Sequence, residues 1–293
     1  MWNELSATFK LKSPLHIGYL PSGASIISPT RYYVPGRNFW GALTRKITEL
    51  RFVNPTGKDY LKIGRDVMEN FRFSYFYVYD GKKVYMPEYR DDGLKYGDMG
   101  IHDFEGRFIS STISTAIMDG LAVDGTLHEI EYINSRFSDG ENVNNTLITG
   151  CIWVKDDAPS YLEIEEDGIL LDENNILDEL ILGGESKYGF GHVILDSFND
   201  KRRIPLDVEL STDIIISDRF LKGHMKYSDD FRFMGDVELI SGRGYIDPET
   251  GKRNGRPGGI ILKPEYYLSP GTFIEDESSL ILSWDGTLKQ LES

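Results

Sequence analysis

The chain has 293 residues, of which 40% are hydrophobic, enough for one large domain or two modest ones. Its single cysteine, Cys151, excludes internal disulfides and a cysteine-rich zinc site, so we expect a reducing, cytoplasmic setting. A net charge of −15, averaged over the chain, argues against nucleic-acid binding, because phosphate contacts need Lys and Arg.

The first elements follow from hydrophobic periodicity. Residues 5–15 alternate apolar and polar side chains, which predicts a strand, and residues 32–34 form a short extended piece that ends at Pro35. Residues 38–51 carry apolar side chains at helical spacing, so we predict an amphipathic helix that Asn38 caps.

The middle of the chain mixes strands with an irregular stretch. Residues 71–79 and 83–86 predict a hairpin that turns at Asp80–Gly81. Residues 87–112 are polar and rich in glycine, and we expect a long loop. A second helix is predicted over 172–182, and further strands are predicted at 126–133, 146–154 and 190–198.

This order of elements predicts an α+β fold, specifically a ferredoxin-like (RRM-like) βαββαβ domain with insertions. We expect this domain over residues 1–198, with its main insertion at about 87–125. A mostly β region should follow over residues 199–293, with the basic Lys201–Arg203 at the junction and a turn at 247–251.

Charge is unevenly distributed along the sequence. Residues 156–180 contain ten acids and no Lys or Arg, whereas residues 31–51 contain five bases and one acid, and residues 243–263 contain five bases and two acids. Separated stretches of this kind can still give one basic face. The alternative is that both are solvated surfaces, which is the favoured interpretation for the acidic run.

Three segments together resemble the RAMP superfamily of CRISPR proteins (repeat-associated mysterious proteins). The segments, which span about residues 5–196, are Ser13–Gly18 with Tyr33–Gly36 and Phe39–Leu43, then Thr115–Asp119 with Gly125–Glu131, and finally the glycine-rich Leu182–Val193. The resemblance implies a guide-RNA-binding structural subunit of a type III antiviral interference complex, of the backbone or 5′-handle-cap kind. Its partners would be guide RNA and the other effector subunits.

Two places are the candidate RNA contacts. In the turn 183–191, glycines at 183, 184, 189 and 191 expose main-chain amides, while Lys187 adds a charge and Tyr188 a stacking face. A helix end followed by a tight turn is the alternative, and it explains only the first two glycines.

The second candidate place is the start of the first helix. Its amino-terminal end should be open to phosphate, with Arg31, Arg37, Arg45 and Lys46 near it or along it. The alternative is a solvated basic patch.

Catalysis is the next question. His16 follows the first strand, and the resemblance allows a metal-independent endoribonuclease that uses it to process repeat RNA; a structural histidine is the favoured alternative. Target-cutting relatives carry an aspartate where this chain has Ile27, which argues against target cleavage. Asp119 matches another family position, but Gly120 replaces the arginine expected after it.

No other cofactor or site pattern emerges. We expect no metal, no cofactor and no membrane contact, since no run of eighteen apolar residues occurs. A ferredoxin-like module that binds a protein through its acidic face remains the third functional hypothesis.

Overall fold

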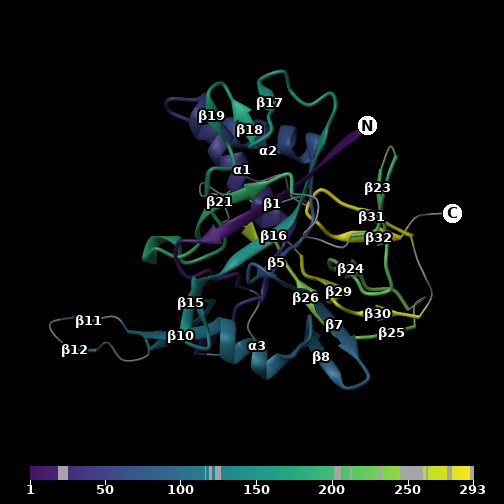
Figure 1. The fold of residues 1–293 in the computed structure, drawn as a ribbon. Helices are drawn as coiled ribbons and strands as arrows, with labels where there is room; N and C mark the ends of the chain where they lie inside the picture. Colours follow the sequence, from purple (N-terminus) through teal and green to yellow (C-terminus); the bar gives the residue numbers. More distant parts are fainter. Residues whose placement is uncertain are drawn as a thin grey trace.

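The computed structural model describes residues 1–18, 26–115, 117–118, 121–122, 127–200, 206–211, 213–229, 232–244, 260–261, 263–275 and 279–290. It is an α+β protein built around one central antiparallel sheet (Figure 1). The predictions for Asp119, Gly120, Lys201–Arg203 and the turn at 247–251 lie outside these residues.

The central sheet runs in the order β20-β21-β1-β16-β5-β3, and β4 and β6 pair with β16 and β5. The strands are β1 (Trp2–Leu11), β3 (Tyr33–Val34), β4 (Phe71–Phe73), β5 (Phe76–Tyr79), β6 (Val84–Tyr85), β16 (Leu147–Lys155), β20 (Glu179–Ile181) and β21 (His192–Phe198). β16 is an almost continuous buried run because both faces of this sheet are covered.

Two helices cover one face of the sheet. α1 (Gly36–Arg51) buries Phe39, Leu43 and Ile47 against the strands, and the ring of Phe39 lies 3.9 Å from that of Phe76. α2 (Gly57–Asn70) packs beside α1 and begins with a reciprocal cap between Thr56 and Asp59. The spacing of apolar residues therefore predicted α1 correctly.

The C-terminal strands cover the opposite face, so the molecule has three layers (Figure 1). Trp2, Cys151 and Trp153 project from β1 and β16 into this second core. Its main sheet contains β22 (Val208–Leu210), β23 (Ile214–Ser217), β31 (Ser279–Leu282), β32 (Leu288–Gln290), β24 (Met225–Lys226), β29 (Glu265–Leu268) and β26 (Val237–Ile240). Two separate short pairs also occur in this region, β25 (Phe233–Met234) with β30 (Phe273–Ile274) and β27 (Arg243–Gly244) with β28 (Ile260–Ile261).

The expectation of a long loop over 87–112 is wrong. The segment forms β7 (Pro87–Arg90), β8 (Gly93–Tyr96), β9 (Met99–Gly100), α3 (Ile101–Phe108) and the start of β10 (Ile109–Ser114). Its glycines serve turns, since Gly93 and Gly97 have positive φ, and Phe104 and Phe108 are fully buried.

An arm follows this segment. β10 pairs with β13 (His128–Ile133), which pairs in turn with β2 (Ile27–Ser28). The pair β11 (Ile117–Met118) and β12 (Leu121–Ala122) extends away from the body of the protein (Figure 1). β14 (Arg136–Asp139) and β15 (Asn142–Asn145) form a hairpin that leads into β16.

The helix predicted over 172–182 is also wrong. The segment holds β19 (Asn174–Asn175) and β20, after β17 (Leu162–Ile164) and β18 (Ile169–Leu171). Asp172 adopts a left-handed backbone, and the Asn175 amide group hydrogen-bonds the main chain at Asp167 and Leu177, which competes with a helix. The apolar side chains at 176, 177 and 180 are buried in this folded-back segment instead.

Candidate functional site

His16 lies beneath the glycine-rich turn and is 4% exposed. Its Nδ1 lies 2.7 Å from the carbonyl oxygen of Glu131, to which it donates, and its Nε2 lies 3.5 Å from Ser28 Oγ. The amide of Gly184 donates to the carbonyl of His16 at 2.9 Å. A general acid or base must reach its substrate, so this buried ring fits the structural interpretation better than the catalytic one.

The glycine turn is explained largely by backbone geometry. Gly183, Gly189 and Gly191 have positive φ, and a Cβ at Gly183 would approach the His16 carbonyl oxygen to 2.2 Å. A Cβ at Gly191 would lie 1.9 Å from the Leu182 carbonyl oxygen. The argument that a tight turn leaves Gly189 and Gly191 unexplained is therefore wrong. Lys187 and Tyr188, in a short 3₁₀ turn at Ser186–Tyr188, are exposed.

The start of α1 is not an open amino-terminal end, contrary to the prediction. The helix begins at Gly36 after Pro35, and Asn38 is not its cap. Gly36 is buried, and the amide of Arg37 donates to the carbonyl of Asp285 at 3.0 Å. The turn of the C-terminal sheet between β31 and β32 therefore occupies the place where a phosphate was expected.

The predicted basic residues near this helix are in different surroundings. The guanidinium of Arg37 lies over the Trp284 ring, at 6.0 Å from its centroid. Arg45, in the middle of α1, is exposed and forms an ion pair with Glu49, and Lys46 is partly exposed beside it. Arg31 is buried. The helix start thus contacts residues near 285, whereas the glycine turn contacts residues 14–17, and the candidates do not form one cluster.

A buried polar network surrounds Arg31. Its guanidinium forms an ion pair with Glu238 and donates to the hydroxyl of Tyr33 at 2.9 Å. His224 lies 3.3 Å from Glu238 through Nε2, and its Nδ1 lies 2.6 Å from the hydroxyl of Tyr75. These contacts join β3 and β5 of the central sheet to β24 and β26 of the C-terminal sheet.

Burial and hydrogen bonding set the protonation states of His224 and Glu238 in this network. Burial lowers the pKa of His224, so the ring is neutral at pH 7, donating from Nε2 and accepting at Nδ1. Burial alone would raise the pKa of Glu238, but the hydrogen bond from His224 and the charge of Arg31 hold it well below its usual range. The sequence analysis did not single out His224 or Glu238, because no local pattern marks either residue.

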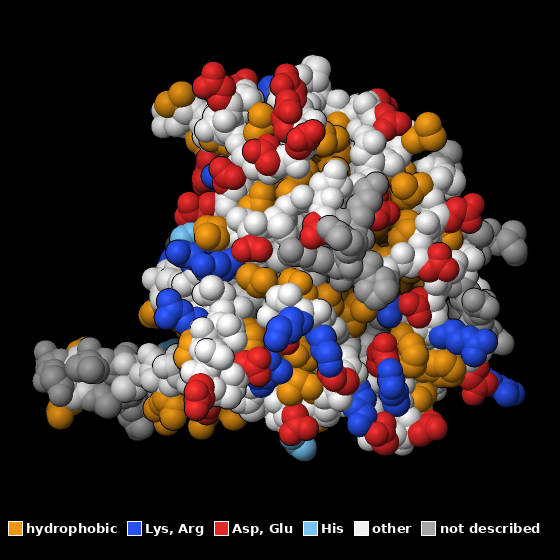
Figure 2. Space-filling model, viewed as in Figure 1, with side chains coloured by type: hydrophobic (Ala, Val, Ile, Leu, Met, Phe, Trp, Pro, Cys, Tyr) orange, Lys and Arg blue, Asp and Glu red, His pale blue; other side chains and the backbone are white. Residues whose placement is uncertain are grey.

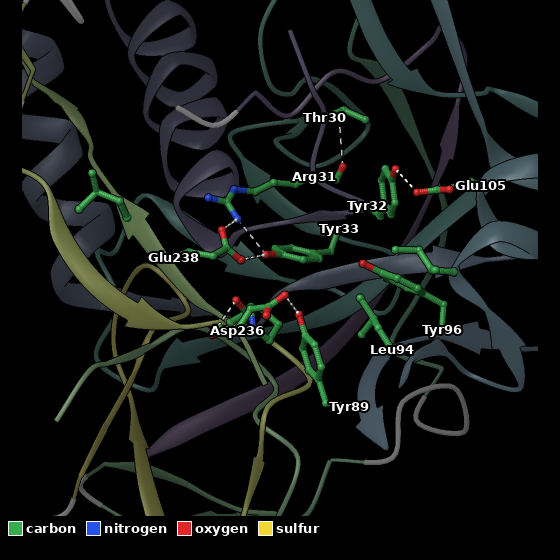
Figure 3. Close-up of a pocket in the computed structure, with 14 residues that line it drawn as sticks. Thr30, Arg31, Tyr32, Tyr33, Tyr89, Leu94, Tyr96, Glu105, Asp236 and Glu238 are labelled. Atoms are coloured by element: carbon green, nitrogen blue, oxygen red, sulfur yellow. Dashed lines mark hydrogen bonds and ion pairs between the residues drawn. The ribbon is translucent and has the colours of Figure 1, made fainter. Parts of the chain in front are cut away.

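A cavity of about 580 Å³ opens above this network. Its walls come from β3, the β7–β8 hairpin, α3, β26 and the turn after β29 (Figure 3). Tyrosines and carboxylates dominate the lining: Tyr32, Tyr33, Tyr89, Tyr96, Glu105, Asp236 and Glu238. This volume is within the range of small-molecule sites.

Each carboxylate in the cavity accepts a hydrogen bond from a tyrosine. The hydroxyl of Tyr32 donates to Glu105 at 2.8 Å, and that of Tyr89 donates to Asp236 at 2.6 Å (Figure 3). Burial, and then the bond to the neighbouring carboxylate, raises the pKa of both tyrosines well above the usual range. The two hydroxyls therefore stay protonated and remain hydrogen-bond donors.

The upper part of the face in Figure 2 is mainly acidic. Figure 2 shows acidic side chains gathered at the top of this face, over β17–β19, whereas the lower half carries most of the Lys and Arg together with further acids. All ten acids of residues 156–180 are exposed, which agrees with a solvated acidic surface. Ile27 lies exposed on β2 beside Glu129.

Metal binding and membrane crossing are two further possibilities for the described part of the chain. Within it, no cluster of three or more His, Cys, Asp or Glu side chains could hold a metal ion. Also within those residues, no helix is both long and apolar enough to cross a membrane.

Comparisons with known proteins find similarity in fold only. No family model matches the sequence, and the search of curated proteins finds no match. One solved chain, from "Cryo-EM structure of the Type III-B Cmr-beta bound to cognate target RNA", matches with a TM-score of 0.50 and 12% identity, over 93% of this chain and 86% of that one.

Two other solved chains belong to related assemblies. The assembly bound to cognate target RNA and AMPPnP gives a TM-score of 0.49 at 11% identity, with 93% and 86% of the two chains covered. The apo assembly gives 0.36 at 11% identity, with 66% and 96% covered. The match at a TM-score of 0.50 shows that the chain shares, over most of its length, the fold of one chain from a type III-B Cmr-beta assembly.

Proposed function

We propose that this protein is a guide-RNA-binding, non-catalytic subunit of a type III CRISPR interference complex. One observation carries the proposal: the fold matches, over 93% of this chain, that of a chain in a type III-B assembly bound to target RNA. The order of the Ser13–Gly18, Tyr33–Gly36 and Leu182–Val193 segments supports the same family independently. Fold alone does not specify function, so the RNA contact needs its own test.

The sheet supports a ferredoxin-like RAMP domain over residues 1–198. Its central strands follow the order β21-β1-β16-β5 with antiparallel neighbours. α1 lies between β1 and β5 in the chain. This order agrees with a βαββαβ domain in which β17–β20 would replace the second helix. The C-terminal region, residues 199–293, would then be an addition fused to the open face of the sheet.

We place the RNA contact at the glycine turn. Lys187 and Tyr188 are exposed there, and Gly189 has open space around its Cα. A lysine beside an aromatic ring can hold a phosphate and stack a base. The buried Arg31 and the covered end of α1 are left out of this site, and Arg45 and Lys46 on α1 would form a separate contact. RNA should avoid the acidic surface over β17–β19, which repels phosphate.

Fluorescence anisotropy with labelled repeat-derived RNA tests the assignment. Tyr188→Ala should weaken binding by about 1–3 kcal/mol through lost stacking. Lys187→Ala should weaken binding and lower the salt slope by about one. Lys58→Ala is the matched control, because Lys58 is an exposed lysine on α2. If Tyr188→Ala and Lys187→Ala both bind like the parent protein, as Lys58→Ala should, the turn does not contact RNA.

The same RNA tests the absence of catalysis. Incubation in EDTA should leave the repeat RNA intact, because His16 is buried. Cleavage that disappears in His16→Ala would establish the endoribonuclease instead.

A further inference from the structure

The cavity lies between the region of the central sheet and the C-terminal sheet, and its lining contains three tyrosine–carboxylate pairs. Tyr33 lies beside Glu238, Tyr32 beside Glu105 and Tyr89 beside Asp236, each hydroxyl hydrogen-bonded to its carboxylate. One of these pairs has a cation: the guanidinium of Arg31 binds Glu238 and lies 5.9 Å from the centre of the Tyr33 ring. One tyrosine–carboxylate pair of this protein therefore already binds an arginine guanidinium.

The other two pairs have no such cation from the described residues. No Lys or Arg of those residues forms an ion pair with Asp236 or Glu105. Besides Tyr32, Glu105 lies near the exposed His102, whose Nδ1 is 3.4 Å from a Glu105 carboxylate oxygen. Both carboxylates nevertheless line the same cavity, Glu105 on one side and Asp236 on the other (Figure 3). Three carboxylates against one arginine leave the lining with a net negative charge, and this lining attracts a cation and repels phosphate.

We propose that this cavity binds an arginine side chain of another protein chain. A guanidinium matches the lining because it offers five donors in a plane, pairs with carboxylates in bidentate fashion and stacks on aromatic rings. A lysine ammonium would use the charge but not the planar faces. The cavity, at about 580 Å³, has room for the side chain together with the main chain that carries it.

Such a contact would connect the N-terminal part of the chain with the C-terminal sheet. Tyr32, Tyr89 and Glu105 come from β3, the β7–β8 hairpin and α3, whereas Asp236 precedes β26 of the C-terminal sheet. The bound arginine would bridge these parts in the same way that Arg31 bridges Tyr33 and Glu238. Peptide binding to the isolated protein needs no RNA, so a negative result here would leave the proposed RNA contact untouched.

Isothermal titration calorimetry of the full chain with two peptides tests the proposal. The probe is acetyl-Gly-Arg-Gly-amide, and its control carries citrulline, which keeps the shape of arginine without its charge. We expect the arginine peptide to bind with a dissociation constant below roughly 1 mM, which is ordinary for a ligand of this size. The citrulline peptide should bind at least about tenfold more weakly, because charge-assisted hydrogen bonds are lost.

Three variants locate the binding. Asp236→Asn and Glu105→Gln should each weaken the arginine peptide by about tenfold. Glu165→Gln, an exposed acid after β17, is the matched control and should leave the affinity unchanged. Circular dichroism of each variant verifies that the fold is retained.

Other outcomes overturn the proposal. Equal affinity for the two peptides would mean that charge is not recognised, and unchanged affinity in folded Asp236→Asn and Glu105→Gln would place binding elsewhere. Spermidine that binds more tightly than the arginine peptide would make this a general polyamine site. Adenosine or guanosine that binds while the arginine peptide does not would make it a nucleobase pocket.

Discussion

Arg31 and Glu238 form the ion pair at the centre of the junction between the two sheets. The Arg31 side chain is 9% exposed and that of Glu238 is 24% exposed, so neither charge is well hydrated. A buried pair of this kind adds little net stability compared with apolar groups of the same size, but the loss of one partner strands the other charge.

Glu238→Gln should therefore destabilise the protein. Since Arg31 would lose its carboxylate while remaining buried, we expect a loss of about 2–4 kcal/mol in the free energy of unfolding, measured by urea denaturation. Glu265→Gln is the matched control, because its ion pair with Lys226 is exposed and should be worth less than about 1 kcal/mol. Equal losses in the two variants would contradict the buried role of Glu238.

His224 gives a pH dependence with a definite sign. Burial lowers the pKa of its ring in the folded protein, whereas the unfolded chain takes up a proton near its ordinary pKa of about 6.5. The unfolded state then binds more protons, so stability falls as the pH is lowered from 7.5 through 6.5 towards 5.5. Glu238 titrates below this window, because its pKa is depressed.

The slope of the unfolding free energy against pH measures this contribution. The parent protein should lose up to about 1.4 kcal/mol per pH unit below 6.5 through this group, and His224→Gln should lose less over the same interval. His102→Gln is the control, since that side chain is exposed on α3. A slope unchanged in His224→Gln would show that the ring is not held neutral.

At the scale of elements, the glycine turn packs directly against main-chain oxygens. Gly183 lies against the carbonyl of His16, and Gly191 lies against that of Leu182. A side chain at either position would push a main-chain oxygen away, whereas Gly189 only requires the left-handed backbone.

Alanine substitutions separate these two requirements. Gly189→Ala should cost about 1–2 kcal/mol, the price of a left-handed non-glycine residue. Gly183→Ala adds a clash with the backbone, and we expect a total above about 3 kcal/mol in urea unfolding. A smaller loss in Gly183→Ala than in Gly189→Ala would refute the close packing of the turn on residue 16.

The elements that could be predicted are those with a strong local pattern. The alternation of apolar and polar residues indicated β1 even though that strand is buried on both faces. The helical spacing of Phe39, Leu43 and Ile47 indicated α1, because these residues lie on its buried face. The pattern at 172–182 was misleading because the left-handed Asp172 and the side-chain bonds of Asn175 outweigh helical spacing. α2 carried a Thr56–Asp59 capping signal that the sequence analysis did not use.

The site was less predictable than the fold. Lys187 and Tyr188 are exposed, and their contact with RNA stays a prediction. The cover over the start of α1 comes from residue 285, far along the sequence. The cavity joins residues near 31, 89, 105 and 236, and no local pattern relates such distant positions. Tertiary packing alone brings them together.

At the scale of the whole molecule, the central sheet is buried on both faces. α1 and α2 cover one face, and the C-terminal sheet covers Trp2 and Trp153 on the other (Figure 1). Because the second core needs side chains from both parts of the chain, the C-terminal region and the sheet beneath it should unfold together.

Trp153→Ala tests this shared core. The indole is fully buried between the central and C-terminal sheets, and its removal should cost about 3–5 kcal/mol. Unfolding of the parent protein, followed by tryptophan fluorescence and by far-ultraviolet circular dichroism, should give coincident transitions that shift together in the variant. Two separate transitions in the parent would instead indicate independent domains.

Cross-linking of guide RNA in an assembled complex tests the central claim most directly. The protein would be purified with the subunits from neighbouring genes and a guide RNA containing 4-thiouridine, irradiated, and mapped by mass spectrometry. The account predicts cross-links on the turn 183–191, centred on Tyr188, and none on the acidic strands β17–β19. A complex that assembles and holds guide RNA without any cross-link to this chain, or with cross-links confined to the acidic strands, would contradict it.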